Sequence, residues 1–162
     1  MIKIVFWNLS GGSGKSTLAL GLAKELMRRS RTVVIVDLDT YIGNTFSGIP
    51  ISHEPDEKYE FNLFDCPPTK REDILAEVKA ADIVIVPQHS SCTLDVDQML
   101  EDWCDPKKTF LVPTWYQYGR KVFTTKKFNM TENKLTWSVP AMDKEVSKVC
   151  EELADSIMGK PA

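Results

Sequence analysis

Residues 2–17 read IKIVFWNLSGGSGKST, an apolar run followed by a glycine-rich loop, a lysine and two hydroxyl residues. The run at residues 2–7 has the composition of a buried strand. Residues 15–29 place Leu18, Leu22 and Leu26 at i, i+4 and i+8, which predicts one apolar face of a helix. A glycine loop between a strand and a helix is the setting of a phosphate-binding loop.

This loop has the chemistry needed to bind a nucleoside triphosphate with magnesium. Glycines let backbone N–H groups approach phosphate oxygens, and the start of a helix adds unsatisfied N–H groups and a positive dipole end. Lys15 supplies charge for the β- and γ-phosphates, and the Ser16 hydroxyl is a magnesium ligand. The alternative is a glycine turn with an ordinary surface lysine, which the flanking strand and helix disfavour. The residues expected to bind the nucleotide are Ser10, Gly11, Gly12, Ser13, Gly14, Lys15, Ser16 and Thr17.

The rest of the chain alternates short β-rich runs with helical patterns. We expect strands at 32–36, 59–64, 83–86 (closed by Pro87), 109–112 (closed by Pro113) and 135–139, and helices at 71–80, 93–103 and 141–158. Residues 40–56 are interpreted as a loop, and 115–133 are left unassigned. Strands that are apolar throughout are covered on both faces. The pattern predicts a three-layer α/β sandwich with a mainly parallel sheet, the P-loop NTPase fold, as one domain over residues 1–162.

The net charge, the cysteines and the apolar runs exclude several classes of protein. The formal net charge is -3, which excludes a uniformly basic nucleic-acid-binding surface but leaves room for a local basic patch. The four cysteines form no CxxC pair, as expected for reduced thiols. Neither a signal peptide nor a bilayer-spanning apolar run is visible. We therefore expect a cytoplasmic protein that does not associate with membrane.

Acidic residues follow two of the expected strands. Asp37-Leu38-Asp39 comes after the strand at 32–36, and Asp65-Cys66-Pro67-Pro68 comes after the strand at 59–64. Ligands of open parallel sheets bind at the carboxyl ends of the strands, so these carboxylates should lie near the glycine loop. The alternative is a strand-ending turn in which aspartate makes local hydrogen bonds.

The crowded glycines resemble the deviant phosphate loop of the ParA/MinD family of ATPases, lysine-glycine-glycine-any-glycine-lysine-serine/threonine. The match runs from Gly11 to Ser16, and the two aspartate motifs resemble the family's in order and spacing over roughly the first ninety residues. The resemblance implies ATP and Mg²⁺ as cofactors. It further implies that Lys15 and Asp39 are catalytic, with Asp39 orienting the attacking water, and that Ser16 and Asp65 serve the metal.

Ser10 stands where the family has a signature lysine, which reaches the partner's nucleotide in a dimer. Serine cannot supply that charge, so nucleotide binding and hydrolysis are separate expectations. The resemblance implies an ATP-dependent homodimer that acts in plasmid or chromosome partitioning, with non-specific DNA and a ParB-like centromere-binding protein as partners. One alternative is a nucleotide-dependent binding module or switch with little or no hydrolysis. The other is a small-molecule kinase or ligase on the same fold.

Two further features leave alternatives open. Trp115 and Tyr116 follow a late strand and could pack on a purine, or equally belong to the core. The basic pairs at 120–121 and 126–127 could contact DNA phosphates, or form a solvated loop. The last helix has acidic residues on its polar side, which argues against an anionic membrane surface.

Overall fold

The computed structural model describes residues 1–8, 15–38, 48–89, 102–105, 107–117, 120–123, 126–129, 134–137 and 145–158. The glycine loop at 9–14, Asp39 and most of the helix expected at 93–103 lie outside the described residues. No helix in the described part of the chain is both long and apolar enough to cross a bilayer.

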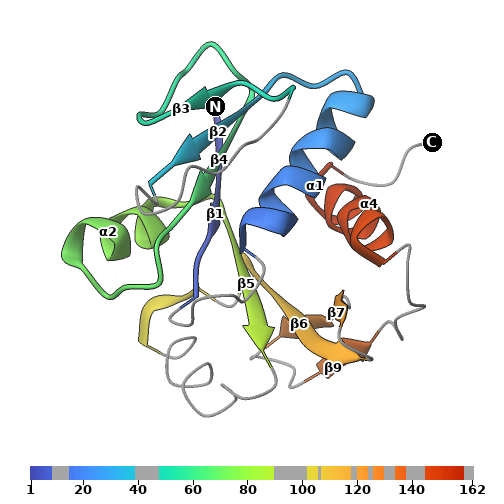
Figure 1. Ribbon diagram of the computed structural model, residues 1–162. Coiled ribbons are helices and arrows are strands. Elements are labelled where there is room, and N and C mark those ends of the chain that lie inside the picture. The colour runs from blue at the N-terminus through green and yellow to red at the C-terminus, as the bar shows by residue number, and fades with distance from the viewer. Residues whose placement is uncertain are drawn as a thin grey trace.

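Six parallel strands form the centre of the molecule (Figure 1). Their order across the sheet is β3-β2-β4-β1-β5-β6. Their bounds are β1 (Ile2–Phe6), β2 (Val33–Asp37), β3 (Ile51–Ser52), β4 (Phe61–Asp65), β5 (Ile83–His89) and β6 (Thr109–Gln117). The central strands have no solvent-exposed face, which confirms the parallel sheet expected from their apolar composition.

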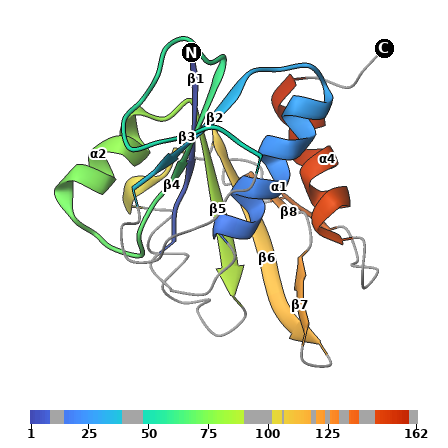
Figure 2. The same cartoon turned by 45° about the horizontal axis from the view of Figure 1, so that its top comes forward.

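Helices cover both faces of this sheet. Helices α1 (Lys15–Arg28) and α4 (Glu145–Met158) lie on one face, and α2 (Glu72–Ala80) lies on the other (Figures 1 and 2). Alternate residues of the central strands β1, β2, β4 and β5 enter two separate apolar clusters, so that Ile4 and Phe6 pack toward α1 and α4. Val5 and Trp7 pack toward α2. The three-layer α/β sandwich is therefore confirmed.

Helix α1 forms as its sequence predicts. Leu18, Leu22 and Leu26 are fully buried against the sheet, which confirms the predicted apolar face. The helix ends because Ser30 takes a left-handed φ of 64°. This turn lets the Arg31 N–H donate to Leu26 O at 3.0 Å, a C-cap bond that satisfies one carbonyl of the last turn.

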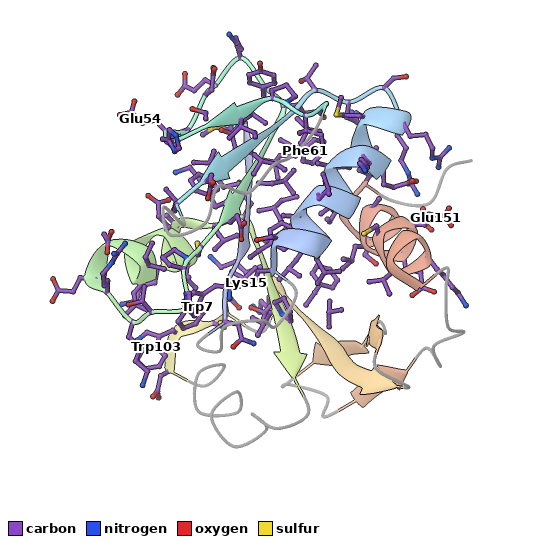
Figure 3. All side chains as sticks on the ribbon, in the orientation of Figure 1. Trp7, Lys15, Glu54, Phe61, Trp103 and Glu151 are labelled. Carbon is purple, nitrogen blue, oxygen red and sulfur yellow. The ribbon has the colours of Figure 1, made fainter. Side chains whose placement is uncertain are left out.

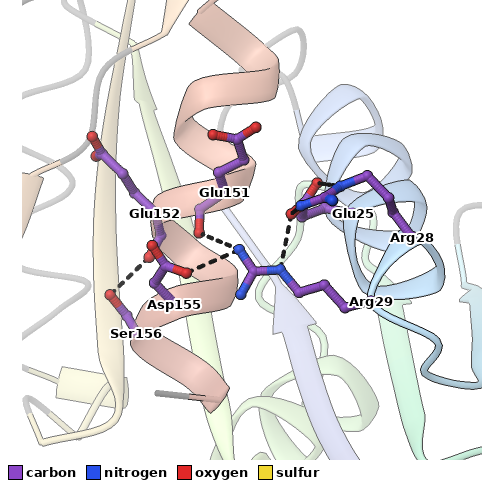
Figure 4. Close-up of polar contacts among 7 residues, drawn as sticks. All are labelled: Glu25, Arg28, Arg29, Glu151, Glu152, Asp155 and Ser156. Carbon is purple, nitrogen blue, oxygen red and sulfur yellow. Dashed lines mark hydrogen bonds and ion pairs between the residues drawn. The ribbon is translucent and has the colours of Figure 1, made fainter. Parts of the chain in front are cut away.

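An ion cluster joins α4 to α1 (Figure 4). The Arg29 guanidinium, directly after the end of α1, donates to Glu25 Oε1 of α1 at 2.9 Å and forms a 2.9 Å ion pair with Asp155 Oδ1 on α4. It also donates to the main-chain oxygen of Glu151 at 3.3 Å. Beneath these contacts Val149, Cys150 and Leu153 enter the apolar cluster that α1 shares. Helix α4 thus supports the helix that begins at Lys15.

Two prolines do not close their strands, so that part of the prediction is wrong. Strand β5 runs past Pro87 to His89, and β6 runs past Pro113 to Gln117. A proline is tolerated in a sheet where its missing N–H has no partner to meet. Pairing of β5 with β1 ends at Ile85, before Pro87. Pairing of β6 with its antiparallel neighbours skips Pro113.

The regions interpreted as loop or left unassigned contain strands. Strand β3 lies within the expected loop at 40–56, where only two residues pair with β2, a signal too short to detect by periodicity. Beyond β6 an antiparallel extension consists of β7 (Arg120–Phe123) and β8 (Lys126–Asn129), both in the unassigned stretch, and β9 (Lys134–Trp137), which corresponds to the strand expected at 135–139. The two basic pairs therefore lie in β7 and β8, and a solvated loop is wrong for their backbone.

Candidate functional site

The start of α1 and the end of β4 meet at the carboxyl edge of the sheet. Ser16, in the first turn of α1, donates its hydroxyl hydrogen to Asp65 Oδ2 at 2.6 Å. Asp65 is 1% exposed, and the neighbouring Lys15 is 7% exposed. Figure 3 shows Lys15 at this end of α1, close to the ends of the central strands. The structure thus brings together the three predicted site residues that it describes in full.

Asp37 and Asp65 end neighbouring strands at the same register position. The Leu38 N–H donates to Asp65 O at 3.0 Å, which continues the pairing one step beyond the strands. The predicted convergence of the two acidic motifs is therefore confirmed for these residues. Asp39 lies just outside the described residues, so its assignment to the attacking water stays a prediction.

Asn8 is a buried polar residue of the site that the sequence analysis did not single out. It follows β1, precedes the glycine loop, and is 1% exposed. Its amide donates to Pro87 O on β5, and the neighbouring Trp7 N–H donates to Ile85 O at 3.1 Å. These bonds fix the end of β1 where the loop begins. An amide directly after an apolar strand is the signal that indicates such a role.

Cys66 follows Asp65 and is held by the same edge. Its N–H donates to Phe6 O at 3.2 Å. Burial raises the pKa of the Cys66 thiol, and the negative charge of Asp65 raises it further. A thiol that stays protonated is neither a nucleophile nor a metal ligand. Cys66 is fully buried and packs in the apolar cluster on the α2 face.

A pocket of about 260 Å³ lies beside the site rather than in it. It is bounded by Asp37, His53 and Arg71, and its lining includes neither Ser16 nor Asp65. His53 Nδ1 is 3.2 Å from Asp37 O, which ties the segment after β3 to the end of β2. The pocket therefore lies on the α2 side of β2 and is distinct from the Ser16–Asp65 contact.

The oxygen atoms at Ser16 and Asp65 suit a magnesium ion. Mg²⁺ in nucleotide sites is held by one or two protein oxygens together with substrate phosphates and water. A hydroxyl and a buried carboxylate 2.6 Å apart match that donor set. Within the described ranges no group of three or more His, Cys, Asp or Glu residues forms a metal cage. Any such ion would therefore depend on phosphate oxygens for the rest of its shell.

Three solved structures show the same fold as this chain. Cobyrinic acid a,c-diamide synthase from Mycobacterium smegmatis, solved with ADP and magnesium, matches 96% of this chain and 82% of its own with TM-score 0.56 and 16% identity. A plasmid partition protein from Borrelia burgdorferi matches 74% and 81% with TM-score 0.52 and 17% identity. The apo form of McdA from Cyanothece matches 100% and 83% with TM-score 0.51 and 16% identity.

Sequence comparison identifies the family. No curated protein sequence matches the chain. The model of the CobQ/CobB/MinD/ParA nucleotide-binding domain matches residues 4–157, which is nearly the whole chain. The matched range includes helix α1, which begins at Lys15, and strand β4, which ends at Asp65. The family contains P-loop ATPases and related nucleotide-dependent enzymes. This chain belongs to the CobQ/CobB/MinD/ParA family of nucleotide-binding domains.

Proposed function

We propose that this chain binds Mg-ATP at the start of α1 and acts as a ParA-like ATPase. The observation that carries the proposal is the 2.6 Å contact between the Ser16 hydroxyl and Asp65, with Lys15 buried beside it. A hydroxyl, a carboxylate and an ammonium at one helix start are the groups that magnesium and the β- and γ-phosphates require. Family membership over residues 4–157 supports the same conclusion.

Each residue has a distinct task in this proposal. The N–H groups of residues 10–14 and the Lys15 ammonium hold the phosphates. Ser16 would hold magnesium directly and Asp65 would hold it through a water, and the ion would supply positive charge to the phosphates. Asp39 orients the attacking water. Phosphoryl transfer needs positioning and charge neutralisation more than a strong base, so a carboxylate suits this task.

The cellular role that we propose is plasmid or chromosome partitioning. ATP favours a homodimer, the dimer binds non-specific DNA, and hydrolysis, stimulated by a ParB-like protein, resets the cycle. The basic pairs in β7 and β8 supply phosphate-binding charge on an otherwise acidic chain. Because Ser10 replaces the lysine that completes a partner's site, we expect turnover to be slower than nucleotide binding alone would suggest.

Nucleotide binding is tested by calorimetry with ATP and magnesium on the parent protein and on Lys15→Ala. Truncating a buried charge that faces phosphate should weaken binding at least about thirtyfold. Lys24→Ala is the matched control, because Lys24 is exposed on the same helix. We expect the control to bind as the parent does. Equal binding by Lys15→Ala and the parent would place the nucleotide elsewhere and end the proposal.

Assembly and turnover need separate measurements. The mass of the protein in solution is determined with Mg-ATP, with Mg-ADP and without nucleotide, together with retention on non-specific DNA. We expect a dimer and DNA retention only with ATP. An unchanged mass and no retention would refute the partition role and leave a nucleotide-binding module. Phosphate release in a single turnover should disappear in Asp39→Ala, and release that depends on an added metabolite would instead indicate a kinase or ligase.

A further inference from the structure

The segment that leaves Asp65 is anchored to β1 by a tryptophan side chain. The Trp7 indole N–H donates to the main-chain oxygen of Thr69 at 3.0 Å. Trp7 is fully buried, follows β1 directly, and stands one residue before Asn8. Its ring lies in the apolar cluster on the α2 face, together with Cys66. One indole therefore joins the strand that leads into the phosphate loop to the segment that follows the magnesium-side carboxylate.

This segment has few other anchors of its own. Pro67 and Pro68 have no N–H to donate. The Cys66 N–H donates to Phe6 O at its beginning. Farther along, the described bonds of Thr69 and Arg71 are local, since the Thr69 N–H donates to Pro67 O and the Arg71 N–H to Thr69 Oγ1. The Trp7 indole is thus the described link that crosses from the middle of this segment to the phosphate-loop strand.

The indole is itself held in place from the other side. Trp103 meets Trp7 edge to face, with ring centroids 6.1 Å apart and planes at 90°. The Lys70 ammonium lies 5.0 Å from the centre of the Trp103 ring. Figure 3 shows Trp7 and Trp103 side by side beneath α2. The two rings and the ammonium fix the direction in which the Trp7 N–H points.

We propose that Trp7 is a positioning residue for the magnesium side of the nucleotide site, an inference that rests on the function proposed above. Asp65 Oδ2 must keep its place beside the Ser16 hydroxyl while magnesium and phosphate arrive. A segment fixed at Thr69 holds the main chain that leaves Asp65 and so keeps the carboxylate in that place. A phenyl ring at position 7 would also lie in the cluster, but it lacks the N–H that the indole donates to Thr69 O.

The test separates hydrogen bonding from packing. In Trp7→Phe the ring stays in the cluster and the N–H is lost. In Trp103→Phe the same change from indole to phenyl is made in the other ring of the pair, while the bond from Trp7 to Thr69 O remains. At fixed ATP, the magnesium concentration for half-maximal nucleotide binding should rise about three- to tenfold in Trp7→Phe and less than about twofold in Trp103→Phe. ATP binding in the presence of EDTA should be unchanged in both.

Several outcomes overturn the inference. They are an unchanged magnesium requirement in Trp7→Phe, equal shifts in the two variants, or a loss of ATP binding in EDTA as large as the loss with magnesium. If Trp7→Phe does not fold, the indole at position 7 is replaced by its benzothiophene analogue, which keeps the bicyclic shape but has sulfur in place of N–H. That protein should show the same shift, and parental behaviour would refute the inference. A parent protein that binds no ATP would instead refute the proposed function.

Discussion

The Ser16 hydroxyl donates a 2.6 Å hydrogen bond to Asp65 Oδ2, across 49 positions in the chain. One residue begins α1 and the other ends β4, so the contact exists only when β1 and β4 pair in their observed register. Because Asp65 is buried, its carboxylate depends on partners such as this hydroxyl. The contact therefore holds the Ser16 hydroxyl oxygen close to Asp65 Oδ2, and both atoms are of the type that a magnesium ion binds.

Removing either partner of this contact should weaken magnesium-dependent nucleotide binding. We expect a loss of about 10- to 100-fold for Asp65→Asn, the size seen when partners of a metal site are removed. Ser16→Ala should lose a similar factor, and the double variant should lose less than the product of the two, because both act on one site. Calorimetry with magnesium and with EDTA measures these factors. Asp73→Asn, which changes an exposed carboxylate on α2, is the control. If the factor lost in the double variant equals the product of the factors lost in Asp65→Asn and Ser16→Ala, the two residues do not share one site.

Stability should depend on Glu25 and on pH. The hydrogen bond from Arg28 is the main cause that lowers the pKa of Glu25 below its ordinary 4.5, and burial opposes it. A carboxylate with a lowered folded-state pKa stabilises the fold above pH 4.5, and this stabilisation is lost as the pH falls below that value. We therefore expect Glu25→Gln to lower the free energy of unfolding by about 1–3 kcal/mol at pH 7. The difference should shrink below pH 4.5.

Denaturant unfolding at pH 7 and at a pH below 4.5 measures this difference. Glu57→Gln, whose side chain is exposed, should change stability by less than about 0.5 kcal/mol at either pH. A Glu25→Gln deficit that stays constant with pH would mean that the lost stability comes from packing and not from the ionised carboxylate.

The buried thiols should resist modification in the folded protein. Burial raises the pKa of Cys104 to about 11 and that of Cys150 to about 12, and it raises the pKa of Cys66 as well. Disulfide reagents react with the thiolate, which is then scarce at neutral pH. In Cys92→Ser, where only these three cysteines remain, we expect slow reaction when folded and three rapid equivalents in denaturant. One fast thiol in the folded protein would contradict this burial.

Helix α4 should contribute strongly to stability through its buried face. Leu153 is 3% exposed and enters the apolar cluster shared with α1. Leu153→Ala should lower the free energy of unfolding by about 2–5 kcal/mol, since a cavity forms beside α1. Lys148→Ala, exposed on the same helix, should change it by less than about 0.5 kcal/mol. Denaturant unfolding measures both, and a loss below about 1 kcal/mol for Leu153→Ala would mean that α4 is poorly packed.

Local pattern was sufficient to predict the central elements. Leu18, Leu22 and Leu26 indicate the buried face of α1, and the apolar runs indicate four central strands, because helical and extended backbones impose different side-chain periods. The acidic motifs follow two of these strands and so predict that their carboxylates lie together at one edge of the sheet. The family resemblance drawn from these motifs is confirmed by the match over residues 4–157. The single domain and the roles of all the proposed site residues, from the glycine loop and Lys15 to Asp39 and Asp65, stay predictions.

Local pattern predicted β9 but not the ends of β5 and β6 or the strands β7 and β8. Whether Pro113 ends a strand depends on what pairs with it. Pro113 stands opposite Gln88 of β5, and neither of the described strands on its other side, β7 and β8, has a residue opposite it. Strands β7 and β8, which lie in the unassigned stretch, have four residues each and owe their form to pairing with β6 and with β9. Short segments of this kind have too few residues to show a period of their own.

The sequence by itself determined which residues are candidates for phosphate and metal binding, because glycine, lysine, hydroxyl and carboxylate groups are the types that this chemistry uses. Tertiary structure decided how they meet. The pairing of β1, β2 and β4 places Asp65 beside both Asp37 and Ser16, and it brings Thr69 O within reach of the Trp7 indole. Such contacts depend on strand order and register, which no local stretch of sequence encodes, and this is why Asn8 and Trp7 were recognised only in the folded chain.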